Sequence, residues 1–211
     1  MASRNRRRAD PQGEEEATAP RPDRRATMQH LWWLLFGGCP TFLAFPYRTT
    51  PDSELWLLAW VGLAPLLWTL HGITPRRAFV YGAFAGFVVN FGGFWWMSRM
   101  FEEFGHLPAV VAWALTVLNA LYQGGMFAFF AGAVVWLGRA RGALPGPLVL
   151  ASAFTAIEYL YPMVFPWYLG NSQHPFTAFV QVADVTGVYG VTFCVVVGNA
   201  LVSAAVARLK G

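Results

Sequence analysis

The sequence has few charged residues and only two cysteines. Charged residues make up 12% of the 211 residues and apolar residues make up 56%, whereas an average globular protein is about 25% charged. The mean hydropathy is +0.42. This composition excludes disorder over most of the chain, argues against a soluble domain and predicts a membrane protein. Because Cys39 and Cys194 lie far apart in apolar stretches, we expect no disulfide framework and no bound metal or cofactor.

Residues 1–27 differ in composition from the rest of the chain. They hold seven of the fifteen basic residues and five of the eleven acids, and they contain no aromatic residue. Such a segment cannot bury enough apolar surface to fold, so we interpret it as a disordered, arginine-rich cytoplasmic tail. Residues 28–211 then form the transmembrane domain. The glutamates at positions 14–16 offset the nearby arginines, and the positive charge therefore does not indicate nucleic-acid binding.

Long apolar runs follow the tail. A bilayer core of about 30 Å is crossed by roughly 20 apolar residues in a helix. The first two runs are short, and we expect them to form a helical hairpin that thins the bilayer or crosses it only in part. Altogether the runs predict an all-α membrane protein, a polytopic bundle of about six transmembrane helices, at 31–46, 55–70, 78–97, 108–137, 147–165 and 186–209.

The distribution of basic residues agrees with this arrangement. Thirteen of the fifteen Lys and Arg residues fall on the side that carries the tail, and only Arg48 and Arg99 fall on the other side. Basic residues are enriched on the cytoplasmic side of membranes, so the split predicts a multi-pass protein with both termini in the cytoplasm. The acids beyond the tail agree, because all of them except Glu158 fall in the outer loops.

Glu158 is the one acid inside an apolar stretch. At a helix rise of about 1.5 Å per residue, it is expected roughly 10 Å inside the outer end of the fifth span. An acid at such a depth usually marks a functional site or a paired contact in the protein interior. No Arg or Lys lies one helical turn away, whereas Tyr161 does. Two interpretations stay open: a hydrogen-bonded glutamate that holds the bundle together, or a direct role at the outer face.

The outer loop over residues 165–184 is too apolar for a free loop and too interrupted for a span. Its helix-breaking Pro166, Gly170 and Pro175 predict a re-entrant or interfacial loop. The sequence shows no nucleophile to pair with His174, and neither cysteine has a basic neighbour, so we predict no catalytic residue among them. The loop also gathers interfacial anchors and polar groups, at Trp167, Tyr168, Asn171, Ser172 and Gln173.

Residues spaced four apart predict helix packing in the third and fourth spans. Small residues and one amide share a face of the third span, at Ala78, Gly82, Gly86 and Asn90. Small residues let another backbone approach closely. Asn119 and Gln123 share a face of the fourth span. Because amides buried in lipid need partners, we interpret this pair as a polar clamp between helices, with a substrate path as the alternative.

An ordered set of motifs resembles the membrane part of bacterial apolipoprotein N-acyltransferase. The central run is FPWYLGNSQ at 165–173, and Glu158 matches the glutamate that precedes this stretch in the family. The resemblance covers residues 31–210. The other pieces fall in the same order, and they are GG at 37–38, LAFP at 43–46, WVGLAPL at 60–66, GF at 86–87, WW at 95–96, QVAD at 181–184, GVYGVTF at 187–193 and Asn199.

The resemblance implies a membrane helix bundle that carries a periplasmic nitrilase-like domain. In that domain a Glu-Lys-Cys triad takes an acyl chain from a phospholipid and passes it to the amino group of a diacylated lipoprotein cysteine. No residue here matches the triad, so we expect it on a separate nitrilase-type chain. Tyr161 stands where the family is expected to have a basic residue. The outer surface that faces lipid or this partner is expected at Glu158, Trp167, Gly170, Ser172 and Gln173.

The implied function is phospholipid-dependent N-acylation of lipoproteins at the bacterial inner membrane. Its implied partners are membrane phospholipids, the nitrilase-type chain and a diacylated lipoprotein, without nucleic acid. Two alternatives stay open. The chain is a non-catalytic lipid-binding scaffold or decayed remnant, or it is a small transporter whose polar path runs past Glu158, Asn119 and Gln123.

The topology is tested with reporter fusions. Reporters placed after Arg77, Arg141 and Lys210 should all read cytoplasmic, because each follows a cluster of basic residues on the predicted inner side. Alkaline phosphatase and fluorescent-protein activities in cells provide the measurement. A periplasmic reading at Lys210 would contradict the six-span arrangement.

Overall fold

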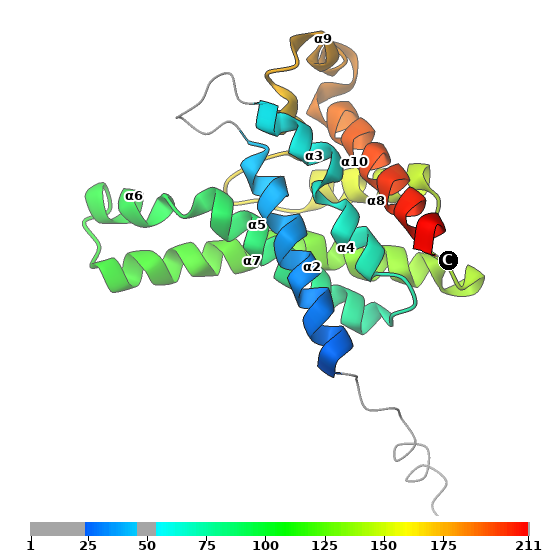
Figure 1. Ribbon diagram of the computed structural model, residues 1–211. Coiled ribbons are helices and arrows are strands. Elements are labelled where there is room, and N and C mark those ends of the chain that lie inside the picture. The colour runs from blue at the N-terminus through cyan, green and yellow to red at the C-terminus, as the bar shows by residue number, and fades with distance from the viewer. Residues whose placement is uncertain (1–23, 46–53, 211) are drawn as a thin grey trace, which may run out of the picture.

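The computed structural model describes residues 24–45 and 54–210, and all regular structure within these ranges is helical (Figure 1). Helix α2 begins at Arg24, within the range that the sequence assigns to the tail, and residues 1–23 of that range lie outside the described residues. The α-helices are α2 (Arg24–Leu43), α3 (Ala59–Gly62), α4 (Ala64–Thr69), α5 (Pro75–Phe94), α6 (Met97–Glu103), α7 (Ala109–Gly138), α8 (Pro147–Leu160), α9 (Thr177–Val180) and α10 (Ala183–Lys210). Short 3-10 helices are η1 (Glu54–Leu58), η2 (Arg139–Arg141) and η3 (Leu169–Gln173).

The described residues hold two helices that are long and apolar enough to cross a membrane, Ala109–Arg141 and Ala183–Leu209. A third candidate is the pair α5 and α6, which is bent by 49° between Phe94 and Met97. The predicted third span, 78–97, is therefore wrong at its outer end, where the chain bends after Phe94. The fourth span agrees with α7 to within one residue at each end, since its apolar run contains no proline after Pro108 and no charge.

The predicted fifth span, 147–165, is too long. Helix α8 has 14 residues and ends at Leu160, and Tyr161 is extended with ψ of 123°. The cause is Pro162, because a proline disfavours helical geometry in the residue before it. The predicted second span, 55–70, is likewise divided into η1, α3 and α4. Both segments are shorter than the roughly 20 residues that cross a bilayer as a straight helix.

Asn199 on α10 supplies the hydrogen bonds at the break between α3 and α4. Its Oδ1 accepts from the backbone N–H groups of Leu63 at 2.8 Å and Ala64 at 3.1 Å. Its Nδ2 donates to the carbonyls of Ala59 at 2.7 Å and Val195 at 2.9 Å. Asn199 is fully buried. One amide thus pairs backbone groups that would otherwise be buried without partners.

Helices α5 and α7 pack antiparallel through glycine. A Cβ added to Gly124 would lie 2.7 Å from the Gly86 carbonyl carbon, and one added to Gly86 would fall on the Gly124 carbonyl oxygen. A Cβ on Gly82 would likewise meet the backbone of Phe127. The predicted packing role of this face of α5 is confirmed. The contact holds two backbones side by side over most of their length (Figure 1).

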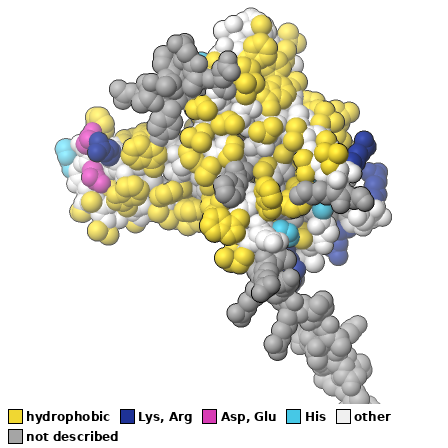
Figure 2. Space-filling model, in the orientation of Figure 1, with side chains coloured by type: hydrophobic (Ala, Val, Ile, Leu, Met, Phe, Trp, Pro, Cys, Tyr) yellow, Lys and Arg dark blue, Asp and Glu magenta, His cyan; other side chains and the backbone are white. Residues whose placement is uncertain are grey.

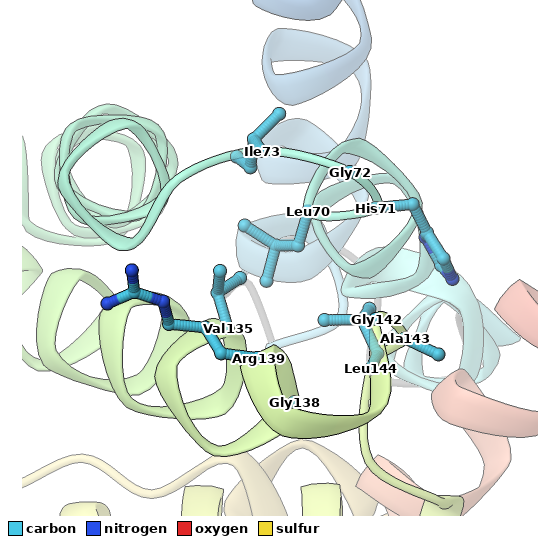
Figure 3. A pocket seen from close by; sticks show the side chains of 10 residues that line it. All are labelled: Leu70, His71, Gly72, Ile73, Val135, Gly138, Arg139, Gly142, Ala143 and Leu144. Atoms are coloured by element: carbon cyan, nitrogen blue, oxygen red, sulfur yellow. The ribbon is translucent and has the colours of Figure 1, made fainter.

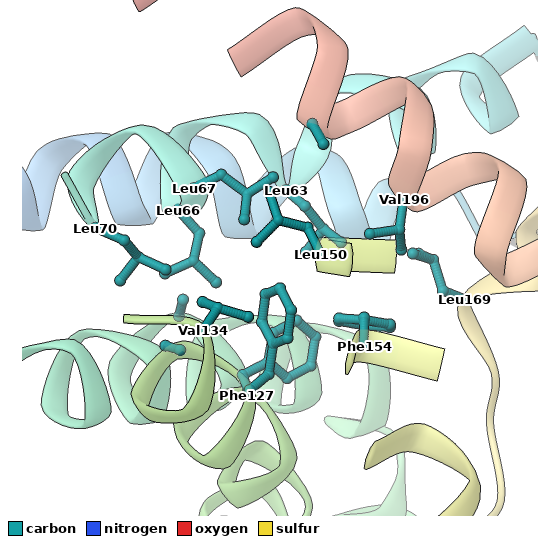
Figure 4. Close-up of a cluster of buried hydrophobic side chains, with 14 of the residues drawn as sticks. Leu63, Leu66, Leu67, Leu70, Phe127, Val134, Leu150, Phe154, Leu169 and Val196 are labelled. Carbon is teal, nitrogen blue, oxygen red and sulfur yellow. The ribbon is translucent and has the colours of Figure 1, made fainter. Parts of the chain in front are cut away.

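The apolar core lies where α4, α7, α8 and α10 meet (Figure 4). Phe154 of α8 packs edge-to-face on two rings of α7, Phe127 with centroids 5.8 Å apart and Phe130 with centroids 5.1 Å apart. Leu67 and Leu70 of the α4 segment cover the same cluster from the other side. All of these side chains are buried. The core therefore ties the short α4 and α8 to the long α7.

Charged side chains separate to the two ends of the bundle. On the face in Figure 2 the acids lie at the left, near α6, and most of the arginines lie at the right, near the end of α7. We call one end the basic end, where α5 begins and α7 and α10 finish, with Arg76, Arg77, Arg139, Arg141 and Arg208. We call the opposite end the acidic end, with Glu102, Glu103 and Asp184, together with Arg99.

The glycine contact makes a prediction about stability. Gly86→Ala should lower the free energy of unfolding by about 1–3 kcal/mol, because the added Cβ meets the α7 backbone, which cannot yield as a flexible side chain does. The expected fall in Tm is about 2–4 °C per kcal/mol, measured by thermal unfolding in detergent. Gly93→Ala on the same helix is the matched control, since nothing lies within 4 Å of its added Cβ. Equal stability of the two variants would contradict the prediction.

Candidate functional site

The chain between α8 and α10 folds back into the bundle at the acidic end. Its central element, η3, has Leu169, Gly170, Ser172 and Gln173 buried. A Cβ on Gly170 would lie 2.6 Å from the carbonyl oxygen of Val188, so only glycine allows this close approach to α10. The following α9 has no buried residue. The segment is thus anchored at η3 and exposed beyond it.

Glu158 holds the start of η3. Its Oε1 accepts the backbone N–H of Leu169 at 2.8 Å, and Gly170 donates its N–H to Thr192 Oγ1 at 2.9 Å. The Glu158 side chain is 2% exposed. Because α8 ends at Leu160, Glu158 lies in the last turn of the helix and not about 10 Å inside its end, as the longer predicted span required. Tyr161 is not its partner, since the Tyr161 hydroxyl donates to the Tyr122 carbonyl.

Gln173 closes the other end of η3. Its Oε1 accepts from the Trp60 indole N–H at 2.8 Å, and its Nε2 donates to the Trp56 carbonyl at 3.1 Å and to Ser172 Oγ at 2.9 Å. The Ser172 hydroxyl donates to the Leu169 carbonyl at 2.7 Å. These bonds join η3 to η1 and α3. Gln173 and Ser172 therefore act inside the bundle.

The segment over residues 161–168 is fastened to α7 by hydrogen bonds. Gln123 Oε1 accepts the backbone N–H of Phe165 at 3.0 Å, and the Tyr122 hydroxyl donates to the Pro162 carbonyl at 2.7 Å. Asn119, one turn earlier on α7, donates from Nδ2 to Met97 Sδ at 3.4 Å. The predicted clamp between helices therefore holds for Asn119, which reaches α6, whereas Gln123 holds the non-helical segment after α8.

Trp167 joins the buried network to an open crevice. Its indole N–H donates to Asn90 Oδ1 at 2.9 Å, and Asn90 Nδ2 donates to the Gly86 carbonyl at 2.9 Å. The Trp167 ring stacks on Phe127 at 6.3 Å and meets Phe45 edge-on at 5.1 Å. The crevice beside the ring has a volume of about 110 Å³ and is lined by Phe42, Phe45, Val89, Gly93, Phe94 and Trp167.

The five residues predicted to form the outer surface divide into two groups. Glu158, Gly170, Ser172 and Gln173 are buried, so their side chains do not themselves face lipid or a partner. They hold η3 in place, because a non-helical segment inside the bundle needs partners for its backbone. Trp167 is partly exposed and lines the crevice. Trp167 is therefore the only one of the five whose side chain reaches the surface, and its contact with lipid or a partner stays a prediction.

The crevice beside Trp167 is lined by apolar residues. None of its six lining residues is an acid, a base or a nucleophile. His174 is exposed, Cys39 and Cys194 are partly buried free thiols, and none of the three lines this crevice. In the part of the chain that the structure describes, no three His, Cys, Asp or Glu side chains gather as a metal site. The geometry suits the binding of an apolar group at the acidic end.

Three residues make hydrogen bonds in this site that the sequence does not predict. They are Asn90, Thr192 and Trp60. The spacing of four places Asn90 on the packing face of α5 with Gly82 and Gly86, and it does not reveal the bond of Asn90 to Trp167. The available signal was that Asn90 is the only amide on that apolar face. Its partner lies 77 residues away in sequence, which helical periodicity does not reveal.

Comparisons with known proteins agree on one family. A family model described as the apolipoprotein N-acyltransferase N-terminal domain matches residues 37–201. The apolipoprotein N-acyltransferase of Haemophilus ducreyi is 32% identical over 163 residues, which are 75% of this chain and 30% of that protein. The protein of the same name from Geobacter metallireducens is 32% identical over 156 residues, 71% of this chain and 29% of that protein. The chain thus spans about 30% of the length of these curated relatives.

The role of Glu158 is tested with two substitutions of similar size. Glu158→Leu should lower the free energy of unfolding by about 1–3 kcal/mol, because it leaves the Leu169 N–H buried without an acceptor. Glu158→Gln keeps an acceptor oxygen and should retain most of the stability. Thermal unfolding and the rate of proteolysis within residues 161–176 are the measurements. If Gln proved as damaging as Leu, the carboxylate charge would be the important property and not its acceptor oxygen.

Proposed function

Because the chain belongs to the family of apolipoprotein N-acyltransferase N-terminal domains, we propose that it is the membrane module of a system that N-acylates lipoproteins. In this proposal the module contacts the acyl-donor phospholipid and positions it for a catalytic chain. The observation that carries the proposal is the Trp167 crevice, which offers apolar walls and an indole fixed by Asn90. An amphipathic ring at such a place suits the boundary between acyl chains and headgroups.

Acyl transfer itself is assigned to groups outside these 211 residues. Transfer through an acyl-enzyme needs an activated nucleophile with a base beside it. Such a pair does not line the Trp167 crevice. The proposed source of the nucleophile is a separate nitrilase-type chain that rests on the acidic end. The acceptor is a diacylated lipoprotein.

The proposed setting is the bacterial inner membrane, with six membrane segments and both termini in the cytoplasm. Support comes from the basic end, where five arginines of the described chain lie without an acid. This end then faces the cytoplasm and the Trp167 crevice faces the periplasm. The short α8 and the divided α3 and α4 accompany a locally thinned bilayer. Residues 1–27 are proposed as the cytoplasmic tail, ahead of the transmembrane domain over 28–211.

The proposal is tested by photo-crosslinking to lipid. The purified chain in nanodiscs should crosslink to a phospholipid with a photoactivatable acyl chain, and Trp167→Ala should reduce the yield severalfold by removing one wall of the crevice. The same preparation, supplied with a diacylated peptide, should form no N-acylated peptide and no acyl adduct on Cys39 or Cys194. Mass spectrometry measures all three products.

Trp113→Ala is the matched control. Trp113 is also a tryptophan of the apolar surface, 42% exposed, and it lies near the start of α7 without lining the crevice. Its loss should leave the crosslinking yield unchanged. Equal yields for all three proteins would remove Trp167 from the site. Robust peptide acylation by the chain alone would overturn the assignment of catalysis to another chain.

A further inference from the structure

A second hollow opens at the basic end (Figure 3). It lies between the turn that follows α4 and the turn that follows α7, and its volume is about 240 Å³. Both turns contain a glycine in the left-handed region, Gly72 with φ of 70° and Gly142 with φ of 63°. The lining residues are Leu70, His71, Gly72, Ile73, Val135, Gly138, Arg139, Gly142, Ala143 and Leu144.

The charge of this hollow is positive and uncompensated. Arg139 lies on one side of it and His71 on the other, with apolar side chains between them (Figure 3). His71 is already engaged, because its Nδ1 donates to the Trp68 carbonyl at 3.0 Å, so Arg139 is the charged group of the lining. Arg76, Arg77 and Arg141 stand on the same turns and helix ends. No acid of the described chain lies at this end, so an anion is the fitting ligand.

The surroundings favour an anion that carries acyl chains. The lining includes the apolar residues Leu70, Ile73 and Val135. Directly before Arg139, the surface of α7 exposes Trp136 and Leu137, at 63% and 47%. A free anion gains nothing from such neighbours, whereas a phospholipid places its phosphate beside the guanidinium and its chains along the apolar surface. The volume is below the roughly 300–1,000 Å³ of pockets for whole drug-sized ligands and suits a headgroup.

We infer that the hollow between residues 70–73 and 138–144 binds the phosphate headgroup of an anionic phospholipid in the leaflet at the basic end. Basic pockets between helices on the cytoplasmic side of membranes bind such headgroups. Arg139 supplies the charge-assisted hydrogen bonds to the phosphate oxygens. The inference relies on the proposed membrane setting, but its lipid is separate from the acyl donor, because the Trp167 crevice lies at the other end.

Native mass spectrometry of the full chain in detergent tests this site. Phosphatidylglycerol should bind at lower concentration than phosphatidylcholine, whose headgroup is zwitterionic. Arg139→Gln should weaken phosphatidylglycerol binding about fivefold, as expected for one basic residue at a membrane surface. Arg208→Gln is the matched control, because it removes the same charge from the same end but does not line the hollow. Ala143→Trp, which fills the hollow without changing charge, should weaken binding as Arg139→Gln does.

The outcomes separate the site from its alternatives. Selective loss in both Arg139→Gln and Ala143→Trp, with Arg208→Gln unchanged, supports the site. Equal loss in Arg139→Gln and Arg208→Gln would overturn it in favour of general surface charge. Displacement of the lipid by millimolar inorganic phosphate would assign the hollow to a soluble anion and overturn the lipid assignment. None of these readings depends on Trp167 or on acyl transfer, so the proposed function stands or falls separately.

Discussion

Backbone groups that lie inside the bundle but outside regular helix constrain this structure more than any other feature. Lipid offers such groups no hydrogen bonds, so the protein has to supply them. Asn199 serves the break between α3 and α4, Glu158 and Thr192 serve η3, and Gln123 serves the segment before it. Each of these side chains stands on a long or well-packed helix. These four buried polar residues are thus explained by the irregular segments that they serve.

The same constraint connects helix packing to the Trp167 crevice. The glycine contact between α5 and α7 fixes the position of α5 along α7. Asn90 donates a hydrogen bond to the Gly86 carbonyl within that contact. Asn90 in turn orients the indole of Trp167. The acidic end therefore presents an apolar crevice with a fixed ring, while the basic end presents a positively charged hollow. The two ends of one bundle thus differ in their chemistry.

Periodicity and composition predicted the features that repeat along a helix. The limits of α7, the packing face of α5 and the family followed from the sequence, because long apolar runs, small residues four apart and ordered motifs are local signals. The end of α8 lies before the predicted end of the fifth span, because Pro162 stops the helix although the apolar run continues past it. The burial of Gln173 and the bond between Asn90 and Trp167 depend on contacts between residues 77 to 117 positions apart, for which a single sequence carries no signal.

The break between α3 and α4 has a consequence for biosynthesis. Its N–H groups at Leu63 and Ala64 are paired by a side chain about 136 residues further along the chain. At roughly 5–20 residues per second, translation needs on the order of ten seconds to reach Asn199 after the break has been made. During that interval the segment has no native partner for these groups. The break therefore reaches its final hydrogen bonding only after α10 has been made, so this part of the bundle cannot be completed in simple order from the N-terminus.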